Sequence, residues 1–165
     1  MSLPLIAQGA WIDSSGTFLP DTESMRTDGN FGVHLLLAPD EKQFRQAWES
    51  TTGTAVLNTT QAVRLGSSVE AVLIFHGCSP NAVGVCDVVA EFFLEGPDGV
   101  KFSLGGGPVW STAALQEGRL QLGHTSMTVE FDANQPAGTY GVIANVNDKV
   151  AGRTLSLIAR VKVTE

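Results

Sequence analysis

Cys78 and Cys86 have the most interpretable chemistry in this chain, because they are its only two cysteines. They are too far apart for the Cys-x-x-Cys spacing that is typical of cytosolic metal and redox pairs. The segment Gly77–Gly84 is rich in turn-forming residues, and an apolar run flanks it on each side, at Val69–His76 and at Cys86–Leu94. This pattern predicts two strands joined by a loop and stapled by a structural disulfide. Two buried free thiols are the alternative interpretation.

A disulfide would also indicate where the protein works, since such bonds persist in oxidising compartments and are rare in the cytoplasm. We therefore expect a periplasmic or secreted protein. Met1–Leu3 lacks the positive charge that begins a signal peptide, and the apolar residues that follow are too few for one. We interpret the chain as a mature fragment without its leader, with a cytoplasmic protein as the alternative.

The histidines do not predict a metal site. The chain has three histidines, and none lies two or four residues from another, which is the spacing of a typical metal-binding pair. His76 lies two residues before Cys78, so the two could share a metal, but a histidine at the end of a strand is the simpler interpretation of His76. We expect His34, His76 and His124 to bind no metal, and we expect no cofactor.

No motif for nucleophilic catalysis or phosphate binding is present. Gly66-Ser67-Ser68 is not the Gly-x-Ser-x-Gly turn that exposes a nucleophilic serine. Gly105–Pro108 lacks the Lys and Ser/Thr that complete a phosphate-binding loop, so we expect a flexible crossover there. The sequence predicts no catalytic residue. Trp11, Trp48 and Trp110 could form a platform for a ligand, but we expect them to pack in the core or at its rim.

Composition favours one β-rich domain. Charged residues make up 16% of the 165 residues, against about 25% in typical domains, and the net charge is −7. The few basic residues are scattered, which disfavours nucleic acid and anionic membranes as partners. No apolar stretch reaches the roughly 18 residues of a membrane-spanning helix. We expect residues 1–30 to form an arm or loop and residues 31–165 to form a β-sandwich domain.

Hydrophobic patterning predicts the elements of that domain. Pro39–Trp48 has helical periodicity, with Asp40 as its N-cap and Phe44 and Trp48 on one face. The remaining pattern predicts about eight or nine short strands, and therefore an all-β fold of two packed antiparallel sheets. We expect strands at Phe31–Leu37, Val69–His76, Cys86–Leu94, Val100–Leu104, Met127–Phe131, Tyr140–Val146 and Leu155–Val163. Weaker patterns at Thr54–Leu57, Gln61–Leu65 and Leu120–Leu122 are candidates for the one or two short strands that complete the count.

The turn Asp132–Gly138 followed by Tyr140 resembles the tyrosine corner of immunoglobulin-like sandwiches, in which a tyrosine hydroxyl bonds to backbone a few residues upstream. Together with the Pro97-Asp98-Gly99 hairpin turn, it makes residues 69–165 similar to secreted bacterial immunoglobulin-like modules. The resemblance implies an immunoglobulin-like sandwich in which Tyr140 has a structural role. Val142 stands where antibody domains have a cysteine, so the disulfide between the sheets of those domains is not expected.

The function that follows from the sequence is coarse. We expect a non-enzymatic extracytoplasmic module that binds a protein or polymer partner through a sheet edge or end loops. A periplasmic carrier of a small ligand or metal is one alternative, and an enzyme with an unrecognised site is another. The resemblance extends weakly to periplasmic copper carriers of the CopC type, but Lys149 stands where those proteins tend to have Gly-His.

Overall fold

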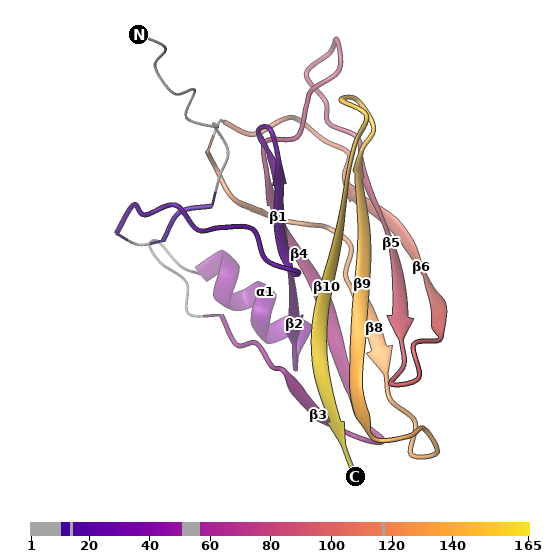
Figure 1. The fold of residues 1–165 in the computed structure, drawn as a ribbon. Coiled ribbons are helices and arrows are strands. Elements are labelled where there is room, and N and C mark those ends of the chain that lie inside the picture. The colour runs from indigo at the N-terminus through magenta and orange to yellow at the C-terminus, as the bar shows by residue number, and fades with distance from the viewer. Residues whose placement is uncertain (1–10, 14, 51–56, 117) are drawn as a thin grey trace, which may run out of the picture.

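The protein folds as two packed β-sheets with one short helix on the outside (Figure 1). The computed structural model describes residues 11–13, 15–50, 57–116 and 118–165. Their strands are β1 (Met25–Asp28), β2 (Phe31–Ala38), β3 (Ala62–Arg64), β4 (Ser68–His76), β5 (Val88–Glu95), β6 (Lys101–Trp110), β7 (Gln121–Leu122), β8 (Met127–Glu130), β9 (Gly138–Asp148) and β10 (Arg153–Thr164). The helix is α1 (Glu41–Ser50), and no helix of the described residues is long and apolar enough to cross a membrane.

The first sheet has the order β1-β2-β4-β7, with β8 also paired to β4, and the second has the order β3-β10-β9-β5-β6. The predicted all-β sandwich with one short helix is confirmed. It differs from the prediction in one pairing, because β3 runs parallel to β10 whereas the other strand pairs are antiparallel. The difference arises because the chain leaves the first sheet through α1 and joins the second sheet at its edge, in the direction of the last strand.

The core lies between the sheets and follows from the alternation of each strand. Apolar side chains at every second position point inward, as the two-residue period of a strand requires. Odd-numbered residues of β2 and β4 meet odd-numbered residues of β10 and even-numbered residues of β5 and β9. The largest fully buried side chains of this core include Phe31, Leu35, Leu73, Phe75, Phe92, Phe131 and Leu157.

The first sheet is covered on its outer face as well, which explains why β4 is apolar on both faces. Asp40 caps α1, since its Oδ1 accepts a hydrogen bond from the Gln43 amide at 3.0 Å. Phe44 of α1 and Trp11 then pack on Val72 and other outward residues of β2 and β4 in a second apolar cluster. The helix therefore lies against the side of the first sheet that faces away from the second (Figure 1).

Three regions differ from, or add to, the predicted elements. The N-terminal region expected to be an arm contributes strand β1, and within this region Trp11 is buried whereas Ile12 and Phe18 are exposed. The expectation of a flexible crossover at Gly105–Pro108 is wrong, because these residues lie within β6. The absence of a side chain at Gly106 lets the Ala90 carbonyl approach closely, which keeps β6 on β5. Most of the predicted strand Thr54–Leu57 lies outside the described residues.

Candidate functional site

The predicted cysteine pair forms a disulfide at one end of the sandwich, in the connection between β4 and β5. Cys86 is buried and Cys78 is half-buried. The loop that carries them is tied to the turn between β9 and β10, since the Ser79 amide donates to the fully buried Asp148 carboxylate at 2.8 Å. The disulfide and this hydrogen bond together hold one end loop in place. This is a structural arrangement.

Tyr140 lies at the start of β9 with its ring in the core. Its hydroxyl donates a hydrogen bond to the Pro136 carbonyl at 2.6 Å, and Pro136 belongs to the preceding turn Asp132–Gly138, as expected of a tyrosine corner. The ring meets Phe131 edge to face, with ring centres 5.2 Å apart. Burial raises the pKa of the Tyr140 phenol, and the nearby Asp98 carboxylate adds to the effect. The residue anchors the turn to the core.

Two histidines on the outer face of the first sheet pack against one tryptophan. The Trp11 ring lies edge-on to His34 and His76, with ring centres 5.7 and 5.0 Å apart. Burial lowers the pKa of both imidazoles, and the Asn30 carbonyl partly offsets the effect at His76. Within the described residues, no group of three or more histidine, cysteine or acidic side chains could hold a metal ion. The geometry is that of an aromatic cluster.

The three tryptophans do not form a shared ligand platform. Trp11 is 7% exposed and Trp110 is 8% exposed, and they belong to apolar clusters on opposite faces of the first sheet. The Trp110 indole donates to the Ala113 carbonyl at 3.0 Å and stacks beside His124. Trp48 packs at the edge of the helix cluster. Each therefore stabilises packing where it lies.

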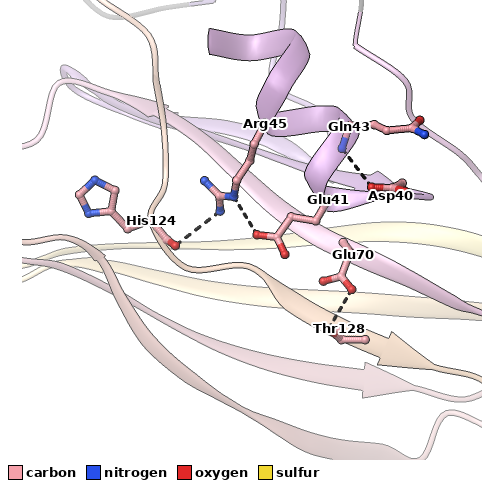
Figure 2. Close-up of polar contacts among 7 residues, drawn as sticks. All are labelled: Asp40, Glu41, Gln43, Arg45, Glu70, His124 and Thr128. Atoms are coloured by element: carbon pink, nitrogen blue, oxygen red, sulfur yellow. Dashed lines mark hydrogen bonds and ion pairs between the residues drawn. The ribbon is translucent and has the colours of Figure 1, made fainter.

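A group of polar side chains lies where α1 faces strands β4 and β8 (Figure 2). Glu41 forms an ion pair with Arg45 at 2.7 Å, and the Arg45 guanidinium also reaches the His124 carbonyl at 3.4 Å. On the sheet below, Glu70 accepts a hydrogen bond from the Thr128 hydroxyl at 2.8 Å, while its second carboxylate oxygen is buried without a partner in the described chain. The helix is thereby held by polar contacts at its N-terminal end as well as by apolar packing.

The two glutamates have opposite environments. Burial raises the pKa of Glu70, and the neighbouring Glu41 and Asp40 carboxylates add to that effect, while the Thr128 hydroxyl opposes it. Hydrogen bonds from Ser126 and Arg45 lower the pKa of Glu41. Such a divergent pair can serve acid–base chemistry when it faces a substrate pocket. Here Glu41 holds Arg45 in the ion pair and Glu70 bonds β4 to Thr128 of β8, and neither lines the cleft between β2 and β10, so we assign both to structural roles.

A cleft of about 450 Å³ opens on the side of the sandwich where β2 of the first sheet approaches β10 of the second. We call it the seam cleft. It is lined by residues 22–24, 34–37, 59–61 and 158–160. Leu35, Leu37 and Ala159 are the apolar residues at its base, and threonine, serine and glutamine side chains surround them. Its volume falls in the range of roughly 300–1,000 Å³ that small-ligand sites occupy.

One stretch of chain closes each end of the seam cleft by bonding to both sheets. At the first end, the Leu35 amide donates to the Ser24 carbonyl at 2.8 Å, and the Ile158 amide donates to the Glu23 carbonyl at 2.7 Å. At the second end, the Thr60 amide donates to the Leu37 carbonyl at 2.8 Å, and the Lys162 amide donates to the Gln61 carbonyl at 2.8 Å. Each end is therefore one extended chain in width.

An ion pair spans the rim of the seam cleft. Arg160 of β10 donates through Nε and Nη2 to the two carboxylate oxygens of Glu23, each at 3.0 Å. This two-point geometry is the strong form of an arginine–carboxylate contact, although both side chains are about half exposed. The hydrogen bond and charge of Arg160 lower the pKa of Glu23. The rim is thus electrically balanced, and the cleft presents hydroxyl, amide and backbone groups rather than net charge.

The sequence predictions placed their site residues elsewhere. Cys78, Cys86 and Tyr140 do not line the seam cleft, and of the three histidines only His34 does. Residues 22–24 lie in the region expected to be an arm, and residues 59–61 precede a strand of three residues. The cleft was missed because it forms between segments that are far apart in the chain, so no local pattern signals it.

Comparison with known proteins gives a weak likeness only. No protein-family model and no curated protein matches the chain. Among solved structures, an alkylpurine DNA glycosylase of Pseudomonas fluorescens, bound to DNA with an abasic site analogue, has a TM-score of 0.43 at 12% identity. The match covers 82% of this chain and 30% of the glycosylase, so the chain spans less than a third of that protein.

Two further structures are similar over most of their own length. The CARDB domain of a Pyrococcus furiosus protein, in complex with di-metal ions, has a TM-score of 0.44 at 10% identity and covers 88% of this chain and 98% of that one. A Niemann-Pick type C2 protein from the Japanese carpenter ant has a TM-score of 0.39 at 11% identity and covers 62% of this chain and 79% of that one. At this level of similarity, none of these structures indicates a function.

Proposed function

We propose that this protein is a non-enzymatic binding module that works outside the cytoplasm and binds a protein or polymer partner through the seam cleft. The single observation that supports the proposal is the cleft itself, a hollow of about 450 Å³ between the edges of the two sheets. Sheet edges present backbone groups to partners, and the sequence already favours recognition through an edge or the end loops.

The chemistry of the lining supports binding over catalysis. Thr22, Ser24, Thr59, Thr60 and Gln61 supply neutral donors and acceptors, which suit recognition of a polar ligand. The only ion pair at the rim is already satisfied on both sides among the described residues. Glu23 at the rim is held by Arg160, and the other glutamates with shifted pKa values, Glu41 of α1 and Glu70 of β4, do not line the cleft. A carrier of a small ligand is the second candidate, and the same cleft volume supports it.

The proposed location outside the cytoplasm rests on the Cys78–Cys86 disulfide, because structural disulfides are rare in reducing compartments. The resemblance of residues 69–165 to secreted immunoglobulin-like modules agrees with that location. A bacterial, secreted or periplasmic origin is part of the same proposal.

The proposal can be tested by blocking the cleft. Thr59 is an exposed rim residue, so Thr59→Trp should fill the cleft without opening the core. Thr139 is an exposed residue of β9 outside the cleft, and Thr139→Trp is the matched control. The wild-type protein and both variants would be screened against a displayed random-peptide library and a glycan array, with circular dichroism to confirm that all three are folded.

We expect ligands that bind the wild type and Thr139→Trp and lose at least roughly tenfold in affinity for Thr59→Trp, a loss of about 1.4 kcal/mol. Ligands that bind all three proteins equally would place recognition elsewhere and overturn the proposal. An absence of any ligand from both screens would also overturn it. Binding of small molecules alone, lost in Thr59→Trp, would favour the carrier.

A further inference from the structure

We infer that the seam cleft takes an extended polypeptide segment of the partner, which pairs by its main chain with β2 and β10 and completes the wall between the two sheets. This inference rests on the proposed function and names the class of partner. The inference follows from the backbone groups that face the cleft. The hydrogen bonds at the two ends of the cleft show which groups these are.

On β2, the backbone groups of odd-numbered residues point away from β4 and toward the cleft. The Leu35 amide and the Leu37 carbonyl show this direction, since they bond to Ser24 and Thr60. The Leu35 carbonyl and the Leu37 amide lie between these two bonds and face the same way, because the N–H and C=O of one residue share a side of the strand. Neither has a backbone partner among the described residues.

On β10, the even-numbered residues point away from β9. The Ile158 and Lys162 amides bond to Glu23 and Gln61, at opposite ends of the cleft. Arg160 lies midway between them, and its backbone N–H and C=O have no backbone partner within the described part of the chain. Two sheet edges therefore offer a donor and an acceptor each across the same gap.

The width of the gap fits one extended chain. Residues 23–24 bridge β2 and β10 at one end, and residues 60–61 bridge them at the other, each as a single stretch of main chain. Neighbouring strands lie about 4.8 Å apart, so the two edges are separated by roughly twice that distance where one chain lies between them. A third extended segment between these bridges would bond to both edges in the same way as they do.

The remaining features restrict the occupant. Both ends of the gap are closed by main chain, so the inserted segment is short and its flanks must leave toward solvent, as those of an exposed loop or a chain terminus do. Leu35, Leu37 and Ala159 at the base favour small apolar side chains. Glu23 and Arg160 neutralise each other at the rim, so a neutral segment is favoured over a charged one.

The test uses the full chain labelled with ¹⁵N and a capped alanine tripeptide as the probe. Backbone amide resonances and their hydrogen exchange would be followed during titration. We expect the Leu37 and Arg160 amides to shift, and their exchange to slow by roughly tenfold when the peptide is at ten times its Kd. The same tripeptide with a methyl group on each backbone nitrogen cannot donate to the Leu35 and Arg160 carbonyls, so it should bind more weakly and shift both amides less at the same concentration.

Three outcomes would overturn the inference. The first is protection of the Leu37 and Arg160 amides before any peptide is added, which would mean that the groups already have partners. The second is equal binding of the methylated peptide, which would exclude main-chain pairing. The third is a response of these amides to methyl glucoside but not to the peptide, which would leave the cleft as a binding site and refute only the class of partner. Thr59→Trp should abolish any response, whereas Thr139→Trp should retain it.

Discussion

The disulfide between Cys78 and Cys86 gives the sharpest quantitative expectation. Its cysteines are separated by 8 positions in the chain, so the bond closes a short loop. In the chain-entropy description, closing such a loop removes about 8 cal/mol/K of entropy from the unfolded state, which is about 2.5 kcal/mol at 25 °C. Reduction of the wild-type protein should therefore lower its free energy of unfolding by about this amount while both sulfur atoms stay in place.

Urea unfolding of the oxidised and reduced protein, followed by tryptophan fluorescence, would measure the change. The midpoint should fall on reduction, and the slope should change little because the loop is short. Replacing both cysteines by alanine should cost somewhat more, since Cys86 is buried and its sulfur packs in the core. Mass spectrometry before and after reduction supplies the control, because reduction adds two hydrogen atoms to a disulfide.

Unfolding of the oxidised and reduced forms at the same urea concentration would contradict this prediction. In that case the loop would be held as firmly without the bond, and the Ser79–Asp148 hydrogen bond would be the stronger constraint. Asp148→Asn in the reduced protein would then lower the midpoint sharply. Absence of the mass difference would instead show free thiols, and the proposed location outside the cytoplasm would lose its main support.

Two further predictions concern stability. Tyr140→Phe should lower the free energy of unfolding by about 1–3 kcal/mol, because it leaves a buried carbonyl of the preceding turn without its donor; an unchanged urea midpoint with weakened ligand binding would instead place Tyr140 in a site. Burial holds the folded-state pKa of His34 and His76 below 6.5, so the unfolded chain binds more protons below that pH. Stability should therefore be full above about pH 6.5 and fall as the pH decreases, by at most about 1.4 kcal/mol per pH unit for each histidine. Urea midpoints from pH 7.5 to 5 would measure the fall, which should persist when the exposed His124 is replaced by glutamine, and a flat profile would contradict the burial argument.

Local features of the sequence were enough to predict much of the fold. The two-residue alternation in β5, β9 and β10 indicates strands with one buried face, because a strand turns successive side chains to opposite sides. Asp40 before an amphipathic stretch indicates the start of the helix, since its side chain can accept from the first free amides. Nearby cysteines on either side of a turn indicate a local disulfide. Each of these rests on residues that are neighbours in the chain.

The structure of a glycine-rich segment cannot be predicted from its local composition alone. Gly105–Gly107 has the composition of a flexible connection, yet it lies within β6. The reason lies in the adjacent strand, because β6 approaches the Ala90 carbonyl so closely at Gly106 that no side chain fits. Propensity describes an isolated segment, whereas a strand is stabilised by the neighbour to which it is hydrogen-bonded.

The sequence by itself determined which faces are apolar, where the helix begins and that the two cysteines are near each other. Only the tertiary structure decided which strand edges meet. The seam cleft exists because β2 and β10 approach from different sheets while residues 23–24 and 60–61 bridge them at its ends. Strand order depends on the packing of all the apolar faces at once, and hydrogen bonds between segments more than a hundred residues apart, such as Arg160 with Glu23, leave no trace in local sequence.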